Sequence, residues 1–187
     1  MSTQHPSLLR IALTFGSLAG IAVILPMLTA MTFSGSEHLF ASEAFGYLIM
    51  LIALSLIFVG VKRYRDVALG GVIRFPKALL LGLMISAVAS LIYVAAWELY
   101  LYRSDYVFID EYVGQVIEAR RQAGLSEQAL AAEIAELETM KANYGNPAYR
   151  LFITFTEIFP VGLLVSLVAA ALLRFPGFLP ARRTATA

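Results

Sequence analysis

Residues 11–33 read IALTFGSLAGIAVILPMLTAMTF, and no residue in this run carries a charge. A bilayer core about 30 Å thick is crossed by about 20 helical residues, so the run is long enough to span a membrane. It is also longer than the apolar core of a cleaved signal peptide, which has roughly 7–15 residues. We therefore expect a transmembrane helix here.

Three further runs have the same character. Residues 44–61 and 78–97 are uncharged, the latter span is expected to extend to about residue 102, and residues 151–173 carry only Glu157. The runs are continuous rather than alternating, and a helix pairs all its backbone polar groups internally, as hydrocarbon requires. The predicted fold class is an all-α membrane protein: one domain over residues 1–187 with four antiparallel transmembrane helices.

The composition of the whole chain agrees. Of 187 residues, 59% are hydrophobic and 14% charged, whereas soluble domains have about 45–50% and about 25%. The absence of cysteine excludes disulfides and thiolate chemistry, and the two histidines are far apart in the sequence. A net charge of +1 gives no general attraction to nucleic acid. We expect the lipid bilayer as a partner and neither metal nor cofactor.

Basic residues indicate the orientation, because Lys and Arg concentrate in cytoplasmic loops. One side would hold nine of them: Arg10, Lys62, Arg63, Arg65, Arg74, Lys77, Arg174, Arg182 and Arg183. The first connection instead carries Glu37 and Glu43, and the long third connection has five basic residues against eight acids. We expect both termini in the cytoplasm and the third connection outside.

The third connection, residues 103–150, is predicted to form a helical hairpin over about residues 104–146. Apolar residues recur at helical spacing in two stretches: Ile109, Val113, Val116 and Ile117, then Leu130, Ile134 and Leu137. Between them Gly124 fits a helix stop and Ser126 an N-cap, and Asn143–Pro147 ends the second helix. Two interpretations remain open, a cap packed on the span ends and a docking surface for a membrane or periplasmic protein.

Two carboxylates in the spans are the main candidates for chemistry. Glu98 and Glu157 lie in the outer halves of their helices, and a charge inside a bilayer needs a partner, a cavity or water. If they were neighbours they would share a proton, which suits proton coupling or cation binding. Alternatively each pairs with Arg103, Arg150, a tyrosine or a serine and only fixes helix register.

Pro160 adds to the polarity around Glu157. It cannot donate a backbone hydrogen bond to the carbonyl of Thr156. The freed carbonyl, Thr154, Thr156 and Glu157 would then form a polar spot beside a kink. Such kinks occur in transporters and also in inert spans.

Three other groups of residues have two interpretations each. The cytoplasmic basic patch of Lys62, Arg63, Arg65, Arg74 and Lys77 would attract anionic headgroups or only orient the chain. Arg65 and Asp66 are candidates for an ion pair.

Small residues at Ala12, Gly16 and Gly20, and at Gly82, Ser86 and Ser90, favour close packing within the bundle or homo-oligomers. Tyr93, Trp97, Tyr100 and Tyr102 are typical of an interfacial aromatic belt or a ligand-stacking wall.

Several segments resemble one family in the same order. They are Lys62-Arg63-Tyr64-Arg65-Asp66, Gly70-Gly71-Val72-Ile73-Arg74-Phe75, Lys77-Ala78-Leu79, Ser90-x-x-Tyr93-Val94-x-x-Trp97-Glu98 and Thr156-Glu157-Ile158-Phe159-Pro160-Val161-Gly162. Over about residues 8–175 the chain resembles the bacterial membrane family catalogued as domain of unknown function number 4199. The resemblance implies four spans with a helical outer loop. The family's activity is unassigned, so no catalytic residue is carried over.

Enzyme motifs are absent: the sequence has no H-E-x-x-H, no G-x-S-x-G and no phosphate-binding G-x-x-x-x-G-K. The leading hypothesis is a non-catalytic accessory or scaffold protein of the bacterial inner membrane that interacts through its outer hairpin. The alternative is a small proton-coupled transporter that uses Glu98 and Glu157. Four spans without an internal repeat are few for a carrier.

Overall fold

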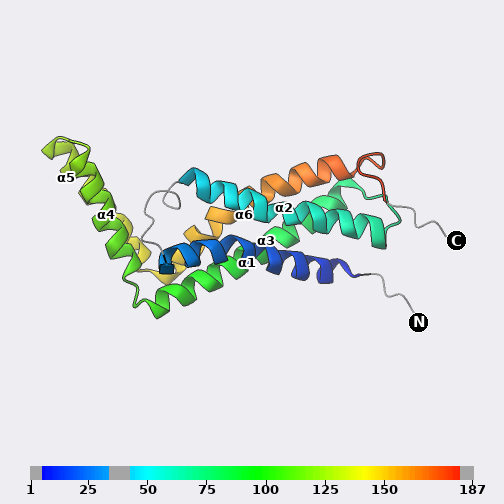
Figure 1. The fold of residues 1–187 in the computed structure, drawn as a ribbon, viewed down its shortest axis with the longest axis horizontal. Coiled ribbons are helices and arrows are strands. Elements are labelled where there is room, and N and C mark those ends of the chain that lie inside the picture. The colour runs from blue at the N-terminus through cyan, green and yellow to red at the C-terminus, as the bar shows by residue number, and fades with distance from the viewer. Residues whose placement is uncertain (1–5, 34–42, 182–187) are drawn as a thin grey trace. The chain divides into compact units, whose positions relative to one another are not determined.

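The structure is a computed structural model that describes residues 6–33 and 43–181, and within these ranges it is helical without strands. The helices are α1 (Leu8–Phe33), α2 (Glu43–Ala68), α3 (Phe75–Arg103), α4 (Phe108–Gln122), α5 (Glu127–Tyr144) and α6 (Pro147–Leu173) (Figure 1). The expectations that involve Glu37, Arg182 and Arg183 lie outside the described residues.

Four of these helices, α1, α2, α3 and α6, are long and apolar enough to cross a membrane. The predicted all-α class with four such helices is confirmed. The second span was expected to end at Val61, but α2 continues to Ala68. Its last turns are polar, and Lys62 and Asp66, four residues apart, form an ion pair along the helix, which favours helical continuation.

The ends of the shorter elements follow the expected local rules. Gly124 has φ 75° just beyond α4, the left-handed conformation that glycine adopts without strain. The Ser126 side chain accepts a hydrogen bond from the backbone N–H of Ala129, so its prediction as the N-cap of α5 is confirmed. Pro147 begins α6, where its missing N–H costs no helical hydrogen bond.

The chain forms two compact units. The first comprises residues 1–93 and 155–187, and the second comprises residues 94–154. Helices α3 and α6 are each continuous and contribute residues to both units. The single domain expected for residues 1–187 is not tested by this division.

In the first unit, α3 and α6 meet along a seam of small residues. A Cβ added to Gly82 would lie 2.8 Å from the Cβ of Ser166, and one added to Gly162 would overlap the side chain of Ser86. Since Gly82 faces Ser166 and Ser86 faces Gly162, the two helices run antiparallel there. Small residues allow this close approach because nothing beyond the backbone has to fit between the helices.

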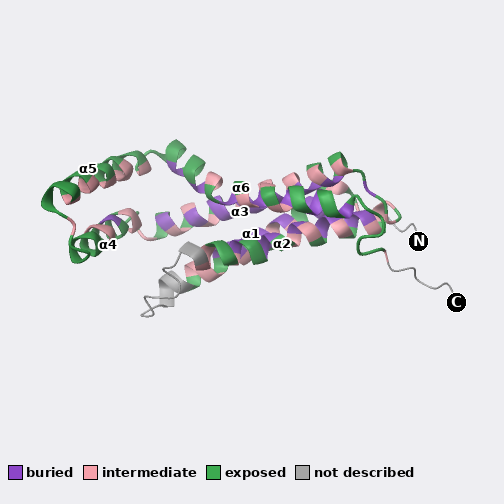
Figure 2. Ribbon diagram, turned by 90° about the horizontal axis from the view of Figure 1, so that it is seen from above, coloured by how far each residue is buried: buried purple, intermediate pink, exposed green. Residues whose placement is uncertain are grey.

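Helix α3 also packs against α1 and α2 in this unit. Gly16 and Gly20 of α1 lie against the backbone carbonyls of Ile85 and Ala89, where an added Cβ would be 2.8 and 2.7 Å away. Gly60 of α2 lies against the end of the Ile85 side chain. Figure 2 shows the buried positions concentrated along these helices. The small-residue ridges of the sequence therefore serve packing within the bundle.

The second unit contains the hairpin of α4 and α5. Arg120 Nε lies 2.7 Å from Glu133 Oε1, and Lys141 Nζ lies 2.6 Å from Asp110 Oδ1, so the two helices run antiparallel. Val113 is the buried residue of α4, and α5 has none. Most of the hairpin surface is exposed.

Candidate functional site

Glu157 contacts one tyrosine in the first unit. The Tyr93 hydroxyl donates to Glu157 Oε2 over 3.4 Å and also lies 3.4 Å from the sulfur of Met27. Both distances are long, and 3.4 Å between oxygens indicates a weak hydrogen bond. Tyr93 is buried on α3, whereas Glu157 keeps an exposed flank on α6. Among the described residues of its unit, the carboxylate thus has one neutral hydrogen-bond donor.

The remaining residues of the predicted polar spot are divided between the units. Thr156 and Pro160 belong to the first unit with Glu157, and α6 continues through Pro160 to Leu173. Thr154 is buried and belongs to the second unit. The chemistry expected of these residues stays a prediction.

Glu98 is held by Arg150 in the second unit. Arg150 Nε donates to Glu98 Oε1 at 2.7 Å, and Arg150 Nη2 donates to Oε2 at 2.8 Å. The third nitrogen, Nη1, donates to the backbone carbonyl of Tyr144 at 3.1 Å. Arg150 is 5% exposed, and its guanidinium lies over the rings of Tyr106 and Tyr144. Such a two-pronged contact fixes geometry as well as charge.

Trp97, one residue before Glu98, makes a second connection between helix ends. Its indole N–H donates to the Tyr144 hydroxyl at 2.7 Å. Its ring stacks on Tyr100 and meets Phe108 edge-on, with centroids 5.3 and 4.8 Å away. Trp97 is buried, so it is part of the packed base of the hairpin rather than an aromatic belt in contact with lipid. This base joins the end of α3 to α4, α5 and the start of α6.

The two candidate carboxylates, Glu98 and Glu157, therefore belong to different units and have different partners. Glu98 belongs to the second unit with Arg150, and Glu157 belongs to the first with Tyr93. Of the two arginines considered as charge partners, Arg150 pairs with Glu98, and Arg103 is exposed in the last turn of α3. A shared proton between the two glutamates stays a prediction.

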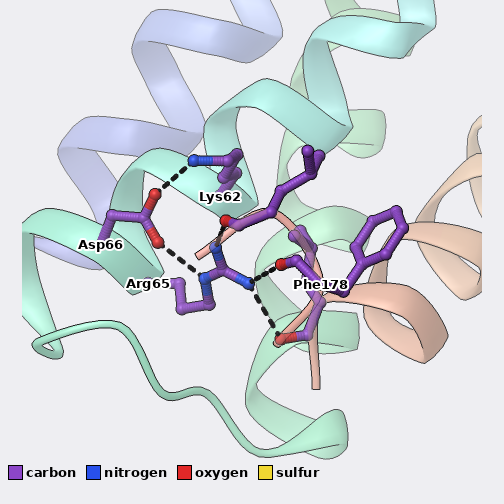
Figure 3. A network of polar contacts seen from close by, with 6 residues as sticks. Lys62, Arg65, Asp66 and Phe178 are labelled. Atoms are coloured by element: carbon purple, nitrogen blue, oxygen red, sulfur yellow. Dashed lines mark hydrogen bonds and ion pairs between the residues drawn. The ribbon is translucent and has the colours of Figure 1, made fainter. Parts of the chain in front are cut away.

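Arg65, predicted as part of the basic patch, is fully buried, and Figure 3 shows its polar contacts. Its Nε donates to Asp66 Oδ1 at 2.7 Å, so the expected pair is present. Its other nitrogens donate to backbone carbonyls after α6, at 2.9 Å for Phe178 and 2.5 Å for Leu179, with a longer contact of 3.5 Å to Leu173. Arg65 thus satisfies two carbonyls of the segment that follows α6, and its longer contact reaches the carbonyl of the last residue of the helix, which has no helical partner.

This burial removes Arg65 from any surface that could meet a lipid headgroup. Lys62 is engaged with Asp66, as Figure 3 also shows. Arg63, Arg74 and Lys77 are exposed, and Lys77 lies over the ring of Tyr64, 5.6 Å from its centroid. The exposed basic patch is therefore reduced to Arg63, Arg74 and Lys77.

The sequence profile of the family described as "Protein of unknown function (DUF4199)" matches residues 14–174. The chain belongs to this family. The match confirms the resemblance seen in the sequence, and it spans α2 to α6 and the part of α1 from Thr14 onward. No curated protein and no solved structure matches the chain.

Within this DUF4199 chain, sequence reasoning missed the roles of Arg65 and Tyr144. Arg65 was indistinguishable from the other basic residues near it, because its carbonyl partners are more than 100 residues away. Tyr144 lies in the segment expected only to end a helix, yet it contacts both Trp97 and Arg150. The sequence did offer one signal for the role of Tyr144, which is its position between a predicted amphipathic helix and an apolar span.

Proposed function

We propose that the protein is a non-catalytic component of the bacterial inner membrane that binds a protein partner through the α4–α5 hairpin. Both termini would lie in the cytoplasm and the hairpin outside. This orientation is supported by the nine basic residues assigned to the cytoplasmic side and the excess of acids in the third connection.

The packed base of the hairpin is the observation that supports the proposal most. Arg150, after the hairpin, binds Glu98 before it, and Tyr144 at the end of α5 binds Trp97. A binding element that is ordered beforehand loses less conformational entropy when its partner binds. The base thus suits a hairpin that presents a constant surface.

The exposed surface of the hairpin indicates the chemistry of the partner. Residues 105–146 contain eight acids and three basic residues, a difference of −5. The basic residues Arg120, Arg121 and Lys141 form ion pairs within the hairpin. The exposed acids include Asp105, Glu111, Glu127, Glu136 and Glu138. A basic protein surface would complement this field and be attracted to it before contact.

The setting of Glu98 supports a structural role over proton transport. Both oxygens of its carboxylate accept hydrogen bonds from Arg150. Losing this charge-assisted contact would leave the buried guanidinium of Arg150 without its partner, which is costly. Glu98 is better suited to holding the hairpin than to releasing and accepting protons.

The test is affinity purification from native membranes in gentle detergent. We expect a partner in stoichiometric amount with the unchanged protein, and its loss when Glu136→Lys and Glu138→Lys reverse the exposed charge of α5. Arg63→Glu is the matched control, because it reverses an exposed charge outside the hairpin. Retention of the same partner by the hairpin variant would contradict the proposal, as would a homo-oligomer without a partner.

A further inference from the structure

Helix α6 has two contrasting faces in the first unit. Its buried face consists of Ile158, Gly162, Ser166, Ala169, Ala170 and Leu173. On the opposite side Leu164 is 62% exposed and Val168 57% exposed. A helix turns about 100° per residue, which places Leu164 roughly 160° from both Gly162 and Ser166, and Val168 roughly 160° from Ser166 and 120° from Gly162. This exposed α6 face is apolar, as expected for a surface in a membrane.

Glu157 lies on the same exposed face. It precedes Leu164 by seven residues, which brings the two within about 20° of each other around the helix. It also lies sixteen residues, about 24 Å, before the end of α6 at Leu173 and six residues, about 9 Å, after the start of the apolar run at residue 151, within the outer half of the span. A carboxylate in contact with lipid at this depth is costly, so such residues usually have a polar or charged partner.

The contact with Tyr93 only partly provides the polar or charged partner that the Glu157 carboxylate needs. A single neutral hydroxyl at 3.4 Å does not balance a negative charge. A second copy of the chain would not provide a cation either, because residues 11–33, 44–61, 78–97 and 151–173 contain no Lys, Arg or His. Charge complementarity therefore favours a different protein, rather than a second copy of this chain, as the source of a cation for Glu157.

We propose that the exposed α6 face of Glu157, Leu164 and Val168 binds a transmembrane helix of a partner protein that carries a lysine or arginine at the depth of Glu157. The apolar residues would pack along the partner helix, and the carboxylate would pair with its cation. This contact lies within the membrane and stands independently of the hairpin, so either interaction can fail without the other.

The test uses the full-length protein in lipid vesicles and a designed helical peptide of leucine and alanine, about 20 residues long. One peptide carries a lysine at the depth of Glu157, and its control carries leucine there. Association is measured by energy transfer between labelled protein and labelled peptide. We expect the lysine peptide to bind about tenfold more tightly, a difference of about 1.4 kcal/mol.

Two variants keep the test specific. Glu157→Leu should abolish the preference for lysine, and Glu157→Gln, which keeps the shape of the side chain, should reduce it. In the matched control, Leu91→Glu is added to Glu157→Leu. Leu91 is 60% exposed and lies sixteen residues after the start of α3 at Phe75, so the carboxylate has the same distance from a helix end on a different face.

The proposal is supported if the lysine preference disappears with Glu157→Leu and does not return with Leu91→Glu. It is overturned if both peptides bind equally, or if a carboxylate at position 91 restores binding, because charge alone would then suffice. It is also overturned if the protein self-associates through Glu157 and excludes the peptide, which would make a second copy the occupant.

Discussion

Arg150 holds both carboxylate oxygens of Glu98, with Nε 2.7 Å from Oε1 and Nη2 2.8 Å from Oε2. The two residues are 52 positions apart, and the whole α4–α5 hairpin lies between them in the sequence. The pair therefore connects the residues that flank the hairpin on its two sides. Glu98 thus has a structural role, which is to hold the base of the hairpin together.

Breaking this pair should loosen the hairpin. Arg150→Met leaves a partly buried carboxylate without its partner, and we expect a loss of about 2–3 kcal/mol, below the range for fully buried pairs because Glu98 is partly exposed. Hydrogen exchange followed by mass spectrometry should show faster exchange over residues 104–146. Adding Glu98→Leu should recover much of the protection. Unchanged exchange in Arg150→Met would contradict the structural role of the pair.

The close packing of α3 on α6 predicts that stability depends on side-chain size at positions 162 and 86. Gly162→Ala places a methyl group on Ser86 and should lower stability by about 1–3 kcal/mol, as overpacking does. Ser86→Gly in the same protein should restore stability, because it removes the side chain that the methyl group meets. Thermal unfolding in detergent measures both. If Ser86→Gly does not restore the stability of the Gly162→Ala protein, residues 86 and 162 are not in contact.

The hydroxyl of Ser86 makes a separate prediction. Ser86 Oγ is buried and has no hydrogen-bond partner among the described residues. Ser86→Ala removes this unsatisfied group without adding volume, so we expect unchanged or slightly higher thermal stability. Ser166→Ala is the comparison, because Ser166 Oγ donates to the carbonyl of Gly162 at 2.7 Å. Marked destabilisation by Ser86→Ala alone would reveal a polar role for this hydroxyl.

Arg65 should control the segment that follows α6. Arg65→Met removes the donors to the carbonyls of Phe178 and Leu179 while keeping an apolar stem. We expect limited proteolysis to cut residues 174–181 faster in this variant. Arg63→Met is the matched control, since Arg63 is exposed and two positions away. Equal cleavage rates in the two variants would show that Arg65 does not hold the segment.

The hairpin should respond to alkaline pH through Lys141. Its hydrogen bond to Asp110 and the nearby negative charge raise the pKa of Lys141 above the ordinary 10.5. The stabilisation from this pair is present below the ordinary pKa and is lost as pH rises through the higher folded value. Nitrogen NMR of the lysine side chains should show the raised pKa, and Asp110→Asn should lower it. Lys141 is exposed, so high salt should weaken the effect; identical titration in both proteins would refute the pair.

Much of the fold follows from local sequence signals. The apolar runs predicted four membrane-length helices, and Gly124 and Ser126 predicted the boundary between α4 and α5. The apolar run that ends at Val61 leaves out the last turns of α2, because residues 62–68 include four charged residues. Local pairing of Lys62 with Asp66 and burial of Arg65 sustain the helix there instead.

The candidate site was less predictable because it depends on contacts distant in the sequence. Arg150 was one of two named partners for Glu98, and spacing could not choose between it and Arg103. The choice follows from the base of the hairpin, where Tyr144 also accepts from Arg150. The exposed flank of Glu157 likewise depends on which face of α6 packs on α3, and the seam at Gly162 decides that face.

The most direct test of the central claim is photo-crosslinking from the hairpin in native membranes. A photoreactive residue is placed in turn at each exposed position from 127 to 143 of α5, with exposed Leu18 of α1 as the control. We predict crosslinks to one protein that repeat with helical periodicity along one face of α5. Crosslinks that are absent or equal at all positions would contradict a partner-binding hairpin.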